Sequence, residues 1–166
     1  MKKILVLLLI ALSFCSCEKD DICSEETTPR LVIEFYDISN PASLKTVLNL
    51  KVREVGQTVD LGTFNSVSKI KLPLKIADTT TKYSFILNST GTTVPPNEDF
   101  LEFNYTTQNV FLSRACGYKT IFTLDNVPTG VVKSDATTPN NFWIQDINIQ
   151  TNAITTENGT HIKIYF

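Results

Sequence analysis

Alternation of apolar and polar residues with a period of two is the feature that most limits how this chain can fold. It is clearest in the stretch SKIKLPLKI, where Ile70, Leu72, Leu74 and Ile76 alternate with three lysines and Pro73. Successive side chains of a strand point to opposite faces of a sheet, so this pattern predicts a strand buried on one face. Because Pro73 cannot donate a ladder hydrogen bond, we expect this strand at a sheet edge.

Similar patterns recur from Arg30 onward and predict an all-β domain. The expected strands fall within residues 30–38, 44–55, 68–76, 82–87, 99–106, 109–113, 117–127, 142–150 and 160–166. No stretch shows a convincing helical period. About eight or nine short strands separated by turn residues favour a single antiparallel β-sandwich over residues 30–166.

The pattern also predicts local details. Residues 44–55 read as one strand with Leu44, Leu48, Leu50 and Val52 on one face. A hairpin is expected around Thr107-Gln108, and a β-bulge near Gln145-Asp146 would explain a change of phase in residues 142–150. Asn158-Gly159 predicts a tight hairpin turn into the last strand. The expected inward residues of that strand are Ile162, Ile164 and Phe166.

The N-terminus has the pattern of a secretory signal peptide. Lys2 and Lys3 precede an apolar run from Ile4 to Phe14, which is shorter than the about 20 residues of a membrane-spanning helix. Ser16-Cys17 then resembles the bacterial lipoprotein lipobox, although Phe14 and Cys15 depart from its usual residues. The resemblance implies cleavage after residue 16 and acylation of Cys17. Residues 17–29 would form a polar tether from the membrane.

The residues directly after Cys17 carry a second resemblance. Lys19, Asp20 and Asp21 resemble the export signal of Bacteroidota lipoproteins, which implies an outer-membrane location with the protein facing the cell exterior. The alternative is that these charges only keep the tether solvated.

Two further cysteines bear on stability and compartment. Besides Cys17, the processed chain keeps Cys23 and Cys116, and in an exported protein two such cysteines most simply form a disulfide. The alternative is two separate buried thiols. Neither a CxxC pair nor a Cys/His cluster is present, so no zinc site is expected. Without Lys2 and Lys3 the chain has 13 basic and 17 acidic residues, a net charge of −4, which gives no sign of a nucleic-acid partner.

Three segments together resemble a known family. They are CEKDDIC at residues 17–23, TPRLVIEFYD at 28–37 and RACGYKTIFTL at 114–124. They are similar to an uncharacterised family of flavobacterial lipoproteins, a domain of unknown function. The resemblance implies a lipid-anchored, mostly β protein of the cell envelope and brings no activity or catalytic residues.

The sequence offers no catalytic constellation. The single histidine, His161, is expected on the outward face of the last strand with Lys163 and Tyr165. There is no GxSxG elbow and no glycine-rich phosphate loop, and no metal or cofactor is expected. A pair of glycosidase carboxylates stays an open alternative, because such a pair is defined by its distance in space and has no fixed spacing in sequence.

Basic residues concentrate between Leu44 and Ile76. Six cations and two acids give this stretch a charge of +4. The cations are Lys45, Lys51, Arg53, Lys69, Lys71 and Lys75. If the strands that carry them pair, one sheet face could bind an anionic glycan or lipid phosphate. The alternative is that edge lysines prevent aggregation.

Asp78-Thr79-Thr80 resembles the Bacteroidota O-glycosylation motif, with Thr79 as the acceptor. Together these features favour a non-enzymatic, lipid-anchored envelope protein that binds or supports an outer-membrane assembly or an anionic glycan. The alternatives are a small outer-membrane β-barrel and, less favoured, a hydrolase acting on glycans.

Overall fold

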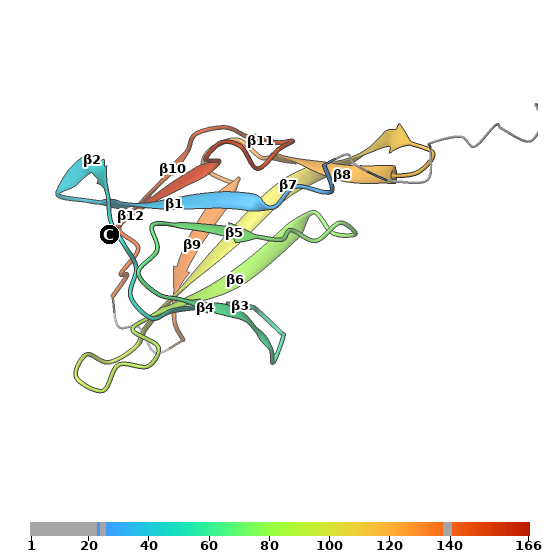
Figure 1. The fold of residues 1–166 in the computed structure, drawn as a ribbon. Coiled ribbons are helices and arrows are strands. Elements are labelled where there is room, and N and C mark those ends of the chain that lie inside the picture. Colours follow the sequence, from blue (N-terminus) through green and yellow to red (C-terminus); the bar gives the residue numbers. More distant parts are fainter. Residues whose placement is uncertain (1–22, 24–25, 138–140) are drawn as a thin grey trace, which may run out of the picture.

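The computed structural model describes residues 23, 26–137 and 141–166, and this part of the chain forms two packed β-sheets (Figure 1). It contains twelve strands and no helix within those residues. The predicted all-β sandwich is therefore confirmed, with more strands than the alternation indicated. No helix in the described ranges is long and apolar enough to cross a membrane.

The first sheet is built around β1. Its strands are β1 (Leu31–Asp37), β2 (Asn40–Leu44), β5 (Lys69–Leu72), β10 (Asp146–Ile149) and β12 (Ile162–Tyr165). The order is β10-β12-β1-β2, and β5 pairs with the first half of β1. Leu31, Ile33 and Phe35 are fully buried, as the alternation predicted. β1 and β12 run parallel, which alternation alone does not reveal because it is the same for either strand direction.

The second sheet is built around one long strand. Its strands are β3 (Leu50–Glu54), β4 (Asp60–Phe64), β6 (Thr80–Leu87), β7 (Asn97–Ser113), β8 (Gly117–Leu124), β9 (Val131–Asp135) and β11 (Ala153–Ile154). The order is β11-β8-β7-β6-β3-β4, with β9 beside the first half of β7. β7 has 17 residues, of which the first half pairs with β6 and the second half with β8.

The predicted strand over residues 44–55 is wrong. Its first part belongs to β2 and its last part to β3, which lie in different sheets. Between them the chain passes from one sheet to the other, so that Val47 is buried whereas Leu44 and Leu48 are exposed. Asn49 has a positive φ of 49°, a left-handed conformation that asparagine tolerates and that bends the chain into β3.

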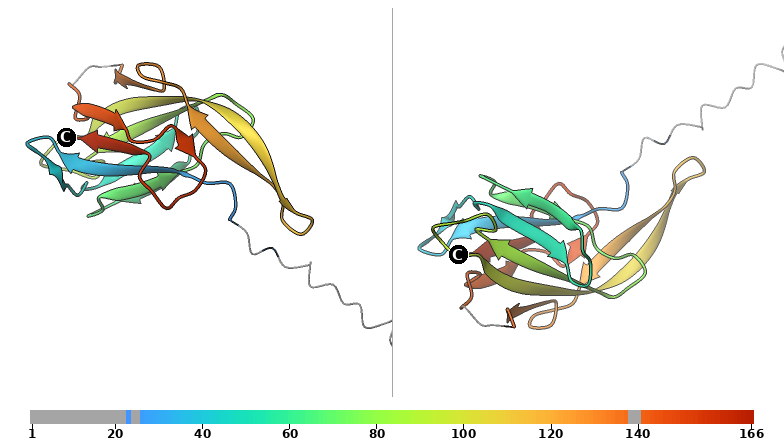
Figure 2. Two further views of the ribbon diagram at one scale, coloured as in Figure 1. Left: turned by 90° about the horizontal axis from the view of Figure 1, so that it is seen from above. Right: turned by 90° about the horizontal axis from the view of Figure 1, so that it is seen from below.

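The predicted hairpin around Thr107-Gln108 is also wrong. β7 runs straight through these residues, and the turn to β8 comes at residues 114–116. Thr106 to Asn109 are exposed because this part of β7 extends past the core, as Figure 2 shows. The run of polar residues therefore marks solvent exposure and not a turn.

Two details near the C-terminus need correction. Asn158-Gly159 does not form a tight hairpin turn, because the flanking strands β11 and β12 belong to different sheets. β10 begins only at Asp146, so the change of phase comes from the chain entering the strand and not from a bulge. Just before it, Trp143 and Ile144 are both buried.

His161 does not face solvent. It is buried, and its Nδ1 accepts a hydrogen bond from the Val32 amide at 2.8 Å. The residue precedes β12, so the alternation of that strand does not apply to it. Burial lowers the pKa of His161, which favours the neutral ring that this bond requires.

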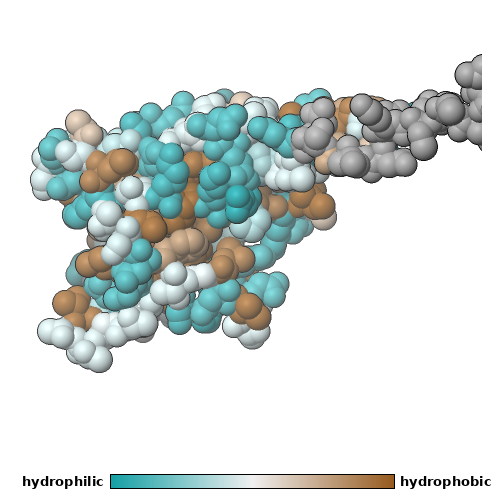
Figure 3. All heavy atoms as spheres, in the orientation of Figure 1, coloured by the Kyte–Doolittle hydropathy of each residue, from teal (hydrophilic) through white to brown (hydrophobic). Residues whose placement is uncertain are grey.

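Aromatic side chains join the two sheets at the end of the sandwich where the chain terminates. The Phe35 ring lies 6.5 Å from that of Trp143 and 6.2 Å from that of Phe166, measured between centroids. The Trp143 indole nitrogen donates a 3.1 Å hydrogen bond to the Phe85 carbonyl of β6, in the other sheet. Apolar side chains of the interior show between the hydrophilic surfaces of the two layers in Figure 3.

Candidate functional site

Three links attach the segment before β1 to the body of the domain, and we call them the N-terminal clamp. They are the Cys23–Cys116 disulfide, a hydrogen bond from the Thr120 amide to Thr28, and the ion pairs of Arg30 and Lys71 with Glu157. Residues 28 and 29 of the predicted tether are therefore packed against the domain, and Pro29 is buried.

The disulfide joins residues 93 positions apart. Cys116 lies in the turn between β7 and β8, and its Cα is 4.9 Å from that of Cys23. The pairing predicted from the cysteine count is present in the structure, and it ties the N-terminal segment to the tip of the longest hairpin.

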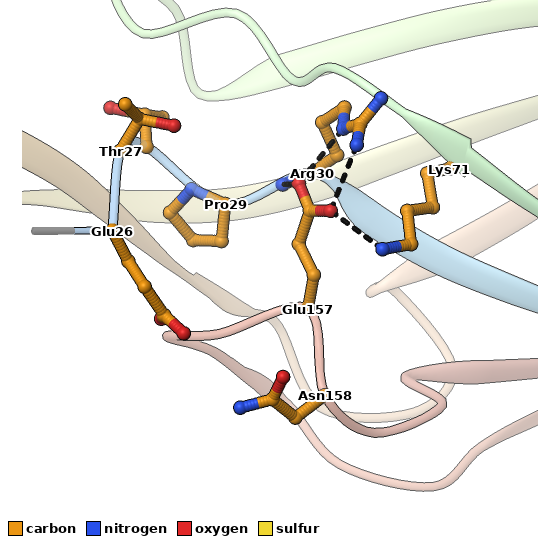
Figure 4. Close-up of a pocket in the computed structure, with 8 residues that line it drawn as sticks. Glu26, Thr27, Pro29, Arg30, Lys71, Glu157 and Asn158 are labelled. Carbon is orange, nitrogen blue, oxygen red and sulfur yellow. Dashed lines mark hydrogen bonds and ion pairs between the residues drawn. The ribbon is translucent and has the colours of Figure 1, made fainter. Parts of the chain in front are cut away.

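Glu157 is the centre of the polar part of the clamp (Figure 4). Its Oε1 accepts from the Arg30 side chain at 2.8 Å and from the Arg30 amide at 2.9 Å. Its Oε2 accepts from the Arg30 Nη2 at 2.9 Å and from the Lys71 Nζ at 2.8 Å. The loop between β11 and β12 is thereby bonded to the start of β1 and to β5.

A hollow of about 460 Å³ borders these residues (Figure 4). It is lined by Glu26, Thr27, Thr28, Pro29, Arg30, Lys71, Glu157 and Asn158. The hydrogen bonds from Arg30, followed by that from Lys71, lower the pKa of Glu157 to about 2. A carboxylate this acidic is a weak base at neutral pH, and both cations already have a partner. The arrangement is suited to holding chain segments together.

Comparison with known proteins places the chain in a family. A family model described as a family of unknown function (DUF6452) matches residues 49–166. The chain belongs to this family. No curated protein and no solved structure matches it. The family match confirms the domain of unknown function that the sequence resembled, whereas its lipoprotein nature and its range of organisms stay predictions.

The region matched by the DUF6452 family contains only one side of the clamp. Lys71, Cys116, Thr120 and Glu157 lie inside residues 49–166, and the segment that they hold lies before it. The central strand β1 also precedes the matched region. The folded unit of this family member is therefore longer than the matched region.

The structure does not bring the six predicted cations together on one sheet face. Lys51 and Arg53 lie on β3 of the second sheet, and Lys69 and Lys71 lie on β5 of the first. Each cation is also within 4.0 Å of a carboxylate oxygen. The pairs are Lys45–Asp37, Lys51–Asp60, Arg53–Asp60, Lys69–Glu34, Lys71–Glu157, Lys75–Glu54 and Lys75–Asp78. The hypothesis of one anionic-ligand face required pairing between strands that lie in different sheets.

β5 lies at the edge of its sheet as Pro73 predicted, since β1 is its single partner among the described strands. Thr79 is exposed in the connection between β5 and β6, and its glycosylation stays a prediction. The leader 1–16, Cys17 and the residues Lys19, Asp20 and Asp21 lie outside the described part of the chain.

Sequence reasoning missed the role of Asp99. This side chain is fully buried on β7, and its Oδ2 accepts a 2.8 Å hydrogen bond from the Ile144 amide. Burial raises its pKa to about 6, and the backbone bond opposes the rise only in part. The signal was present in the alternation, because Asp99 takes the inward position two residues before Leu101, which is also buried.

Changing Glu157 to glutamine tests the polar part of the clamp. We expect Glu157→Gln to lower the free energy of unfolding at pH 7 by about 1 kcal/mol, since it removes one anion from between two cations. The folded pKa lies below the usual 4.5, so this stability is present above pH 4.5 and is lost as the pH falls toward 2. Urea denaturation at several pH values measures the difference.

Glu26→Gln is the matched control for this variant. It removes a negative charge from the same hollow, and Glu26 has no ion pair within the part of the chain that the structure describes. We expect Glu26→Gln to change the free energy of unfolding much less than Glu157→Gln does. Equal effects of the two variants at pH 7 would contradict the role assigned to Glu157.

Proposed function

We propose that this chain is a lipid-anchored protein of the outer membrane whose β-sandwich has a non-enzymatic binding or accessory role, with the domain facing the cell exterior. The observation that carries the proposal is the disulfide at Cys23, six residues after Cys17. It bears on both the compartment and the attachment of the domain.

The disulfide supports export. Structural disulfides persist in oxidising compartments, which include the bacterial envelope, and are rare in the cytosol. An exported chain needs a leader, and residues 1–16 have the pattern of one. Cleavage before Cys17 would leave every residue of the clamp and of both sheets in the mature protein.

The clamp supports attachment close to a bilayer. Cys23 of the disulfide comes six positions after Cys17, and a fully extended chain of that length spans roughly 20 Å. An acylated Cys17 would therefore hold the domain at a short distance from the membrane surface. Buried acyl chains contribute about 0.8 kcal/mol per methylene, so more than one chain gives firm anchoring.

The charged groups favour a structural or accessory role over catalysis. The Glu157 carboxylate is held between two cations, and His161 is buried as a hydrogen-bond acceptor. The division of the basic residues between two sheets also weighs against a large anionic-glycan face. A protein partner in an outer-membrane assembly therefore fits the domain better than a glycan.

Removal of the acylated cysteine tests the proposal. We expect Cys17→Ala to abolish labelling of the native protein by radioactive palmitate and to release it from the membrane fraction into the soluble fraction. Cys15→Ala is the control, because it removes the neighbouring thiol and should change neither result. Continued labelling and membrane association of Cys17→Ala would overturn the proposed anchoring.

A further inference from the structure

The outer halves of β7 and β8 form a two-stranded ribbon that projects beyond the sandwich. We call residues 106–121 the β7–β8 ribbon. Its strands are paired from Gln108 opposite Ile121 to Ser113 opposite Gly117. Figure 2 shows it extending away from both layers at the end opposite the C-terminus. An isolated two-stranded ribbon is marginally stable in water, so its length is not explained by packing of the domain.

An exposed aromatic pair lies near the tip of the ribbon. Phe111 and Tyr118 are directly opposite each other, with ring centroids 5.2 Å apart, and are 55% and 70% exposed. They lie on the face that is buried further along the strands at Tyr105 and Phe122. Burial of apolar surface is favourable, and these two residues largely forgo it within the domain. A contact outside the domain would recover it.

The charge of the ribbon differs from that of the rest of the chain. Residues 106–121 contain Arg114 and Lys119 and no aspartate or glutamate. The chain from residue 17 onward has a net charge of −4 from 13 basic and 17 acidic residues. Aromatic side chains with neighbouring cations suit the boundary between lipid headgroups and acyl chains. Aromatic rings partition into this layer, and cations there bind lipid phosphates.

The disulfide determines where the ribbon lies relative to the anchor. It bonds Cys116, in the ribbon turn, to Cys23. Cys23 comes only six positions after Cys17, so the turn lies within roughly 20 Å of the sulfur that would carry the acyl chains. The chain length therefore requires an anchored domain to hold this tip, and not the opposite end, beside the bilayer.

We propose that the tip of the β7–β8 ribbon docks onto the membrane that holds the anchor. Phe111 and Tyr118 enter the headgroup layer, and Arg114, in the turn at the tip, faces the lipid phosphates. This inference rests on the proposed lipid anchoring of Cys17 and adds a second contact with the same membrane. The two contacts together orient the sandwich, with β2 and the C-terminal end turned away from the bilayer and available to a partner.

Tryptophan fluorescence tests the contact in the lipidated mature protein. The protein is reconstituted into vesicles of phosphatidylethanolamine and phosphatidylglycerol. One set of vesicles contains lipids with bromine on their acyl chains as a quencher. Phe111→Trp places a probe at the ribbon tip. Leu44→Trp is the matched control, because Leu44 is also 55% exposed but lies on β2 at the other end. The native Trp143 is buried and supplies a constant background.

We expect the emission of the added tryptophan in Phe111→Trp to shift to shorter wavelength and to be mostly quenched in brominated vesicles. The emission of the added tryptophan in Leu44→Trp should not be quenched. Flotation with the vesicles is measured on the same samples. If the protein floats but Phe111→Trp is not quenched, the ribbon contact is overturned and the anchoring stays intact. That result would favour a protein partner as the occupant of the ribbon. Equal quenching of both variants would overturn the proposed orientation. Failure to float would remove the anchoring and the contact together.

Discussion

Replacement of Cys116 by serine is expected to lower the free energy of unfolding by about 2–5 kcal/mol. The Cys23–Cys116 bond closes a loop with a sequence separation of 93 residues, which strongly restricts the unfolded chain. It also supports the β7–β8 ribbon, which lacks a core of its own. Urea denaturation of the oxidised protein in a Cys17→Ala background gives the change without interference from a third thiol.

The matching variant supplies the control. Cys23→Ser breaks the same bond, so it should destabilise as much as Cys116→Ser, and the double variant should be no worse than either. Wild-type protein with the bond reduced should behave in the same way. Hydrogen exchange should increase first in residues 106–121. Additive effects, or no effect of either change, would show that the two cysteines act separately.

Replacement of Asp99 by asparagine is expected to change how stability depends on pH. The carboxyl group is fully buried beside the Ile144 amide, and its pKa of about 6 lies above the usual 3.8. The folded state therefore binds its proton more tightly than the unfolded state does. Stability from this residue is highest below pH 3.8 and declines as the pH rises to about 6, by about 1–3 kcal/mol in total.

Asparagine keeps an oxygen for the Ile144 amide and does not ionise, so Asp99→Asn should lack this decline. The measurement is the difference in free energy of unfolding between wild type and variant from pH 4 to pH 7, which cancels the other titrating groups. Glu102→Gln, on the same strand and paired with Lys82 at 3.8 Å, controls for loss of a charge from β7. Parallel pH curves for wild type and Asp99→Asn would contradict the pKa assigned to Asp99.

The comparison of β1 with residues 44–55 shows how far alternation can be trusted. In β1 the inward residues Leu31, Ile33 and Phe35 were predicted correctly, because the whole run belongs to one strand in the middle of one sheet. Residues 44–55 alternate almost as well, yet the chain leaves one sheet and enters the other within them. A repeat of two residues records which faces are apolar and carries no information about the partner strand.

The candidate site shows the same limit. The pairing of Cys23 with Cys116 could be predicted because few cysteines were available. The ion pairs of Arg30 and Lys71 with Glu157 could not be predicted, because they join three segments that are distant in sequence. The basic residues that are neighbours in sequence were separated for the same reason.

The sequence by itself determined the all-β class and the faces of most strands and favoured the disulfide, because these depend on local backbone geometry and on residue counts. Only the tertiary structure decided the assignment of strands to two sheets, the parallel pairing of β1 with β12, the burial of Asp99 and His161, and the projection of the β7–β8 ribbon. Each of these depends on which distant segments pack together. That choice is made by burial summed over the whole core and not by any single stretch of the chain.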